Sequence, residues 1–343
     1  MSSLVDIPAE RTGWVAVGDR PIFALIACHV AIAVVLGMAT GFAFNPHMPA
    51  MLAMLLGILM PWFVLIRFGE LIYRVGFVEK AARPLPATMA ALKGLALDFR
   101  WQIESVAKFL AVTLFIASAG YLKEMITVIQ PFAWDVWFAE LDRLLHFGQD
   151  PWRLLLPLTG SHVVTKGLNI VYHGWFFAIY FCVFVACFSR QATSRVFLIA
   201  FVLTFALAGN LAATVFSSAG PVYFERLGLG EDFAPLMAHL QSLDAIGRLP
   251  ALDVQETLWQ AYEANAGHAA ISAAPSMHVA TSVLMALFAF SCSRFWGWVM
   301  SVFAALIMVG SVVLGWHYAA DGYLGAAMAW GCWWIAGKWV PRP

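Results

Sequence analysis

The chain is poor in charge. Only 12% of its 343 residues are Asp, Glu, Lys or Arg, whereas 62% are hydrophobic, and the mean hydropathy is +0.79. A soluble globular domain carries about 25% charged residues, so the composition excludes that class. Acidic and basic residues also balance to a formal net charge of zero, and nothing in the charge favours nucleic acid as a partner.

Cysteine is scarce, and internal repeats and low-complexity segments are absent. The five cysteines lie in or beside apolar runs, without the spacing of metal ligands, so we interpret them as core or lipid-facing side chains. They are Cys28, Cys182, Cys187, Cys292 and Cys332. We expect no metal and no cofactor.

Apolar runs dominate the rest of the chain, and several reach the length of about 20 residues that a helix needs to cross a bilayer. The alternation typical of a β-barrel is not visible. We therefore predict an all-α, polytopic helical membrane protein with about eight spans. The predicted spans are 21–44, 49–66, 106–126, 167–188, 196–217, 276–292, 295–315 and 322–340.

The distribution of Lys and Arg predicts the orientation. With the N-terminus in the cytoplasm, thirteen of these residues fall on the cytoplasmic side, many of them in the basic connection 67–104, and five on the other. We therefore expect both termini in the cytoplasm. Helix parity then places the long connection 218–274 and the outer ends of the last three spans together on the extracytoplasmic face.

A further amphipathic stretch, 131–146, falls on that same face. Its aromatic and leucine residues follow helical spacing, opposite a face that carries Asp135, Glu140, Asp142 and Arg143. The pattern predicts a helix that lies in the membrane interface. A plain connecting helix packed on the spans would show the same pattern.

Two polar segments stand at the ends of spans, where ionisable groups are costly and therefore suggest a function. In the second of them, His317 and Asp321 are four residues apart, which places both on one face of a helix. A carboxylate beside one imidazole nitrogen would set the tautomer and leave the other nitrogen free to attack. Alternatively, Asp321 caps its own helix and His317 is merely interfacial.

The first polar segment, 274–278, reads Ala-Pro-Ser-Met-His. A proline followed by serine is typical of a helix start, where free N–H groups and the helix dipole can bind an anion. His278 lies in that first turn, where it could protonate a leaving oxygen. The alternatives are a capped helix with an interfacial histidine, or a metal site of His268, His278, His317 and Asp321, although no two of these histidines have helical pair spacing.

Together the two segments resemble the type 2 phosphatidic acid phosphatase superfamily, through Pro-Ser-x-His and, about forty residues later, His-x-x-x-Asp. The resemblance covers roughly 106–340. It implies a catalytic six-span core (105–343) preceded by a two-span extension (1–104). It also implies that His317 is the nucleophile that becomes a phosphohistidine, that Asp321 orients it and that His278 is the acid and base. Ser276, Met277 and the amides beyond them would hold the phosphoryl oxygens without a metal.

The chain departs from the common pattern of that superfamily. Met277 replaces a glycine, Ser311 replaces an arginine, and the Lys-x6-Arg-Pro motif is missing where 217–227 reads Ser-Ser-Ala-Gly-Pro-Val-Tyr-Phe-Glu-Arg-Leu. These features, and 139–151, are similar to the branch that contains the aureobasidin-sensitive inositol phosphorylceramide synthases. Members of that branch transfer a phospho-headgroup between lipids, as in sphingolipid metabolism, and related proteins hydrolyse lipid phosphates.

The missing Lys and Arg leave the phosphate short of cationic ligands. Arg226 is the best-placed local cation, and Tyr223 and His268 could supply hydrogen bonds. The resemblance implies a phospholipid or polyprenyl-phosphate substrate within the bilayer, and a lipid or polyol alcohol as acceptor. The protein would then be a lipid phosphotransferase or a lipid phosphatase that acts on the extracytoplasmic face. The alternative is a non-catalytic lipid-binding or lipid-transport protein that keeps the pocket.

Overall fold

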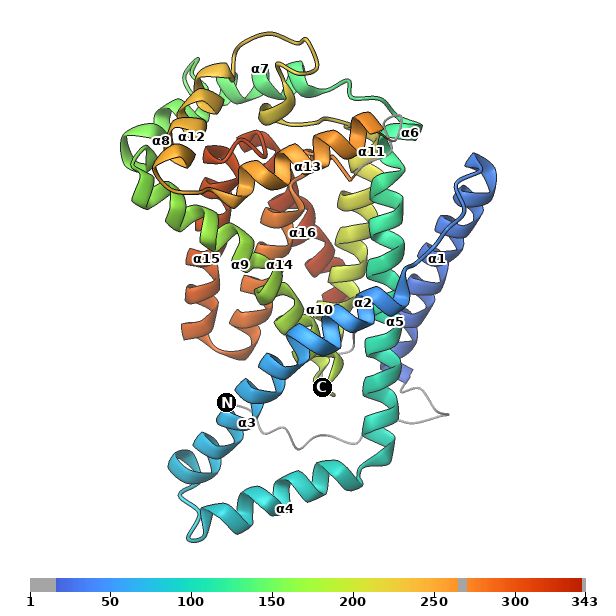
Figure 1. Cartoon of the computed structure of the whole chain (residues 1–343). Helices are drawn as coiled ribbons and strands as arrows, with labels where there is room; N and C mark the ends of the chain where they lie inside the picture. The colour runs from blue at the N-terminus through green and yellow to red at the C-terminus, as the bar shows by residue number, and fades with distance from the viewer. Residues whose placement is uncertain (1–16, 265–269, 341–343) are drawn as a thin grey trace.

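The computed structural model describes residues 17–264 and 270–340, and within these ranges all regular secondary structure is helical (Figure 1). Six helices there have the length and hydropathy to cross a membrane. They are α1 (Arg20–Thr40), the run Met48–Val78, the run Phe99–Ile129 containing α5 (Phe99–Glu124) and α6 (Ile126–Ile129), α9 (His162–Cys187), the run Ala192–Val215, and α15 (Arg294–Val313). The fold class is confirmed: the chain is an integral, polytopic helical membrane protein.

Two further helices coincide with the remaining predicted spans. The first, α14 (Met277–Cys292), is apolar but shorter than the six. The second, α16 (Ala319–Trp339), has the length of a span, but its glycine and tryptophan residues lower its hydropathy. Each of the eight predicted spans therefore corresponds to a helix.

The basic connection 67–104 is largely helical. The second span consists of α2 (Met48–Met54), η2 (Leu55–Leu59), α3 (Met60–Tyr73) and η3 (Arg74–Val78), and α4 (Pro84–Leu97) follows it. The helix continues past Arg67, where the pair of Arg67 with Glu70 one turn later adds a small stabilisation. Asp98 then caps α5 by accepting a hydrogen bond from the N–H of Trp101 at 2.9 Å.

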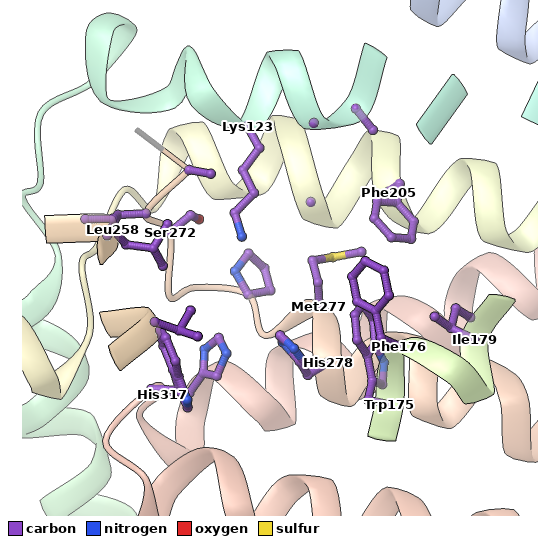
Figure 2. Close-up of a pocket in the computed structure, with 18 of the residues that line it drawn as sticks. Lys123, Trp175, Phe176, Ile179, Phe205, Leu258, Ser272, Met277, His278 and His317 are labelled. Atoms are coloured by element: carbon purple, nitrogen blue, oxygen red, sulfur yellow. The ribbon is translucent and has the colours of Figure 1, made fainter. Parts of the chain in front are cut away.

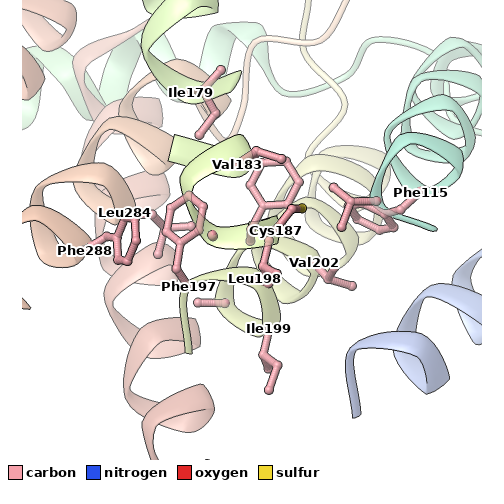
Figure 3. Packing of buried hydrophobic residues seen from close by; sticks show 14 of the residues in the cluster. Phe115, Ile179, Val183, Cys187, Phe197, Leu198, Ile199, Val202, Leu284 and Phe288 are labelled. Carbon is pink, nitrogen blue, oxygen red and sulfur yellow. The ribbon is translucent and has the colours of Figure 1, made fainter. Parts of the chain in front are cut away.

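The main buried core joins the N-terminal helices to the rest of the bundle. Ile22 of α1 and Leu55 of η2 belong to the same hydrophobic cluster as Phe115 of α5 and Leu284 of α14. Figure 3 shows the centre of this cluster, where Phe197 of α10 (Ala192–Thr204) packs against Phe288 of α14 with ring centroids 4.6 Å apart. The bundle is therefore held by aromatic and aliphatic packing across segments that are distant in sequence.

Shorter helices gather at one end of the bundle (Figure 1). They are α7 (Asp135–Leu145), α8 (Pro151–Thr159), α12 (Ala234–Ile246) and α13 (Pro250–Ala264). The connection 218–274 is thus largely helical, and it also contains η5 (Pro221–Tyr223). At the opposite end lies α4.

The amphipathic stretch forms α7, but two of its acidic residues do not face water. Asp135 is 1% exposed and accepts hydrogen bonds from the N–H groups of Ala219 and Gly220 and from the hydroxyl of Tyr318. Asp142 is 3% exposed, and it accepts hydrogen bonds from the N–H groups of Ala319 and Ala320 at the start of α16. The predicted polar face is therefore wrong for these two residues, because unpaired backbone N–H groups of neighbouring loops attract the carboxylates inward.

Candidate active site

A cavity of about 480 Å³ opens among α5, α9, α13 and the two polar segments. Figure 2 shows Lys123, Ser272 and His317 towards one end, and Phe176, Ile179 and Phe205 towards the other. The cavity therefore has a polar end, where both predicted histidines lie, and an apolar end between the spans.

His317 lies in the short connection between α15 and α16 and is 6% exposed. Its Nδ1 lies 2.8 Å from the carbonyl oxygen of Ala273. A carbonyl can only accept, so Nδ1 carries the proton and Nε2 holds the free lone pair. Within the described residues Nε2 makes no hydrogen bond. Burial lowers the pKa of His317 to about 3, against the opposing effect of the hydrogen bond to Ala273, so the ring is neutral at physiological pH.

Asp321, on the first turn of α16, lies beside both the ring of His317 and the start of its own helix. Its Oδ2 lies 3.7 Å from Nδ1 of His317 and accepts a hydrogen bond from the N–H of Tyr318 at 3.2 Å. Its Oδ1 is buried without a partner among the described residues. The carboxylate thus caps its own helix and also borders the imidazole, while the carbonyl of Ala273 is the nearer partner of Nδ1.

His278 forms the facing wall of the polar end. Its ring is held between Tyr172, at a centroid distance of 4.4 Å and nearly parallel, and Trp175, at 4.3 Å. The ring centroid of His317 lies 6.1 Å away. Both imidazoles line the same cavity, as helix parity predicted for their level in the bundle. The two aromatic residues restrict the orientation of His278, and neither was predicted.

Ser276 and Met277 sit at the start of α14. The Ser276 hydroxyl accepts from the N–H of Val279 at 3.4 Å, and the Ser276 N–H donates to the carbonyl of Asp321 at 3.0 Å. Gly325 of α16 permits this contact, because a Cβ there would lie 2.6 Å from the carbonyl oxygen of Ser276. Ser276 is 0% exposed and acts as a helix cap, whereas Met277 lines the cavity.

The Gly-Pro segment supports the connection that carries His317. Gly220 has φ +102°, and a Cβ on it would lie 2.5 Å from the carbonyl oxygen of Trp316. The N–H of Val222 donates to the carbonyl of Gly315 at 2.9 Å. This segment therefore packs against the backbone beside His317, and its residues Ala219 and Tyr223 line the cavity.

The three predicted phosphate ligands have different positions. Tyr223 lines the cavity, but its hydroxyl donates to the carbonyl of Gln255 at 2.9 Å. Arg226 is not a lining residue: it pairs with Glu256 at 2.6 Å, and its side chain is 42% exposed. His268 lies outside the described residues.

Lys123, in the last turn of α5, lines the polar end of the cavity, and sequence reasoning missed it. Among the lining residues within 17–264 and 270–340 it is the only Lys or Arg, and there is no Asp or Glu. The sequence did contain a sign of its role, because Lys123 is one of only a few Lys and Arg residues on the predicted extracytoplasmic side.

The predicted metal alternative is not assembled in the part of the chain that the structure describes. Within 17–264 and 270–340, no three His, Cys, Asp or Glu side chains are grouped as ligands of an ion would be. His268, the fourth member of that set, is not described. The five cysteines are free and none of them lines the cavity.

Fold and site together define a class: a polytopic helical membrane protein with two facing histidines in an amphipathic cavity. The chain belongs to the PAP2 superfamily, whose family model matches residues 136–335, more than half of the chain. No curated protein and no solved structure matches it. Membership in the superfamily supports phosphatase or phosphotransferase activity on lipid phosphates, with the bilayer as surroundings.

The matched region contains α7, both polar segments and most of α16, and it starts later than the expected 106. It includes His278, His317 and Asp321. It leaves out α5, and therefore Lys123. The match therefore covers both histidines, whereas the cation in the cavity comes from a helix outside it.

Proposed function

We propose that this protein transfers a phosphoryl group from a lipid phosphate or phospholipid headgroup through a phosphohistidine on His317. It acts as a lipid phosphotransferase similar to the inositol phosphorylceramide synthases or as a lipid phosphatase. The observation that carries the proposal is the hydrogen bond from Nδ1 of His317 to Ala273 at 2.8 Å, which leaves Nε2 unprotonated in the cavity that His278 also lines.

In the first step, Nε2 of His317 attacks the phosphorus and the bond from phosphorus to the lipid oxygen breaks. His278 donates a proton to the departing oxygen, so the lipid leaves as a neutral alcohol. The two ring centroids lie 6.1 Å apart, so the proposed nucleophile and acid border the same part of the cavity.

In the second step, His278 takes a proton from water or from an acceptor alcohol, and the resulting oxygen attacks the phosphohistidine. The N–P bond breaks and the electron pair returns to Nε2. With a lipid phosphate as donor, water yields inorganic phosphate and an acceptor alcohol yields a phosphomonoester. With a phospholipid as donor the headgroup stays on the phosphorus, so water yields the headgroup phosphate and an acceptor alcohol yields a phosphodiester. Asp321, 3.7 Å from Nδ1, stabilises the positive charge that the ring carries as the N–P bond forms.

The walls of the cavity support a lipid as the substrate. The histidines lie with Lys123 at one end, whereas Ile179, Phe201 and Phe205 line the part that runs between the spans. A hydrocarbon chain buried against these residues would hold the phosphate at the polar end.

The proposed orientation places the site on the extracytoplasmic face and both termini in the cytoplasm. The uneven distribution of Lys and Arg supports this arrangement. In addition, the starts of α14 and α16 lie at the same end of the bundle as α7 and α13 (Figure 1).

The test is to trap the intermediate. Purified protein in detergent is incubated with a ³²P-labelled lipid phosphate, quenched in base and digested. We expect an acid-labile, base-stable label on His317, and none in His317→Ala. Equal turnover by His317→Ala and wild type would overturn the mechanism. Absence of both turnover and label across a panel of lipid phosphates and phospholipids would favour a non-catalytic lipid-binding protein.

The same panel separates transfer from hydrolysis. Each donor is assayed with and without ceramide, diacylglycerol or glycerol. Release of inorganic phosphate or of a headgroup phosphate alone identifies a hydrolase, and an acceptor that carries the phosphoryl or phospho-headgroup identifies a phosphotransferase.

A further inference from the structure

The cavity presents an unusual balance of charge for a site that would bind phosphate. Among the residues that the structure describes, its lining holds one ammonium group, on Lys123, and no carboxylate to neutralise it. The Lys123 ammonium has no hydrogen bond or ion pair with any residue that the structure describes. A cation in a low-dielectric pocket without a partner is costly, so a group of opposite charge would offset much of that cost.

We propose that Lys123 binds the phosphoryl group of the substrate and replaces the arginine and lysine ligands that the polar segments lack. This inference rests on the proposed function, because it names the charge ligand of the same site. The ligand class is a phosphate monoester or a phosphodiester headgroup whose non-bridging oxygens contact Nζ of Lys123 while His317 faces the phosphorus.

The direction of the side chain supports this role. Figure 2 shows the Lys123 side chain pointing into the cavity, on the side where His317 and His278 lie. The electrostatic effect agrees in direction: burial lowers the pKa of His317, the hydrogen bond to Ala273 raises it, and the positive charge of Lys123 lowers it further.

The other cation near the cavity, Arg226, already has partners. Arg226 pairs with Glu256 at 2.6 Å, and its guanidinium lies 5.6 Å from the centre of the Trp259 ring, away from the cavity lining. To reach the phosphate it would have to give up both contacts. Lys123 gives up none, so it is the better ligand on these grounds.

An ordinary role for Lys123 is that of an interfacial anchor whose ammonium reaches towards headgroups. An anchor would place its charge on the outer surface of the bundle. Lys123 instead lines a cavity among α5, α9 and the two histidine segments.

The test measures binding of inorganic phosphate, so that it does not depend on turnover. Isothermal titration compares wild type with Lys123→Met, Lys123→Arg and the control Arg248→Met, whose native side chain forms an exposed ion pair with Asp253. We expect Lys123→Met to weaken phosphate binding about 10- to 100-fold, as for the loss of a charged hydrogen bond. The phosphate affinity of Lys123→Arg is expected to stay within about threefold of that of wild type. Arg248→Met is expected to bind phosphate as wild type does. Unchanged binding in Lys123→Met would overturn the proposal.

The same titration in the His317→Ala background separates this inference from the catalytic one. A Lys123-dependent binding of phosphate there supports the inference even where no turnover occurs. If Lys123→Met does not fold, the test is instead to label the lysines of wild type with a small amine-reactive reagent, with and without phosphate. Phosphate is expected to protect Lys123 from labelling and not the exposed Lys93. Labelling of Lys123 that phosphate leaves unchanged contradicts the inference.

Discussion

Nδ1 of His317 donates a hydrogen bond to the carbonyl oxygen of Ala273, 2.8 Å away. The two residues are 44 positions apart, and the contact joins the two polar segments. A main-chain carbonyl thereby has the tautomer-setting role that the motif assigns to a carboxylate. This relationship leads to the first prediction.

Asp321→Asn is expected to lower kcat about 10- to 100-fold. In Ser-His-Asp sites the equivalent change costs about 10⁴-fold because the tautomer is wrong. Here Ala273 keeps Nδ1 protonated, and only the stabilising charge at 3.7 Å is lost. The check is the steady-state kcat of the purified variant on a lipid phosphate, with thermal stability as the control for the helix cap. A loss as large as that of His317→Ala would show that Asp321, and not Ala273, sets the tautomer.

The stability of the protein should fall as the pH is lowered, in part through His317. The pKa of His317 is about 3 in the folded protein and about 6.5 when unfolded. Above pH 6.5 the ring is neutral in both states and contributes nothing. Between pH 6.5 and 3 only the unfolded state gains the proton, so folding is disfavoured by about 2 kcal/mol at pH 5.

Burial raises the pKa of Asp135 and Asp142, so these two groups make the folded state more stable as the pH falls, opposite to His317. The contribution of His317 is therefore measured as the difference between wild type and a variant without it. The melting temperatures of wild type and His317→Gln are compared from pH 7.5 to 4.5. The variant is expected to lose less stability on acidification. Parallel curves would show that His317 is readily protonated in the folded protein.

Asp142 should be needed for both stability and activity. Its two oxygens accept hydrogen bonds from the N–H groups of Ala319 and Ala320, at 2.7 and 2.8 Å, directly after the connection that carries His317. Asp142→Ala leaves two buried donors unpaired, at a cost of about 2–4 kcal/mol in the free energy of unfolding. The control is Glu140→Ala, an exposed residue of the same helix, which should melt as wild type does.

Gly220→Ala should impair turnover more than it impairs folding. The residue has φ +102°, and the new Cβ would lie 2.5 Å from the carbonyl oxygen of Trp316, next to His317. The backbone beside the nucleophile must therefore move, and a displacement of 1 Å can cost about 100-fold in rate. Kinetic assays compare it with Gly167→Ala, whose Cβ meets no neighbouring atom. Equal kcat in the two variants would contradict the positioning role of the segment.

Much of the fold was predictable from local sequence. A spanning helix must satisfy its backbone hydrogen bonds internally and match the bilayer in length, so eight apolar runs led directly to eight helices. The extra helical turns of 67–104 were not predictable in this way. There, α3 and η3 extend the helix beyond Arg67 and α4 starts at Pro84, and the basic charge of the segment does not predict these boundaries.

The site was predictable only in part. Motif spacing and helix parity selected His278, His317 and Asp321, and the structure brings all three to one end of the bundle. The inward turn of Asp142 and the outward ion pair of Arg226 did not follow from the pattern. Both depend on which partners lie opposite, and these come from remote segments.

The sequence by itself determined the membrane-spanning helices and the two histidine segments, because hydropathy and short-range spacing act along the chain. The tertiary structure alone decided that Ala273 orients His317, that Tyr172 and Trp175 enclose His278, and that Lys123 faces the cavity. These contacts depend on the rotation and packing of helices far apart in the chain. No local pattern encodes such rotations, since each is set by the side chains that the neighbouring helices present.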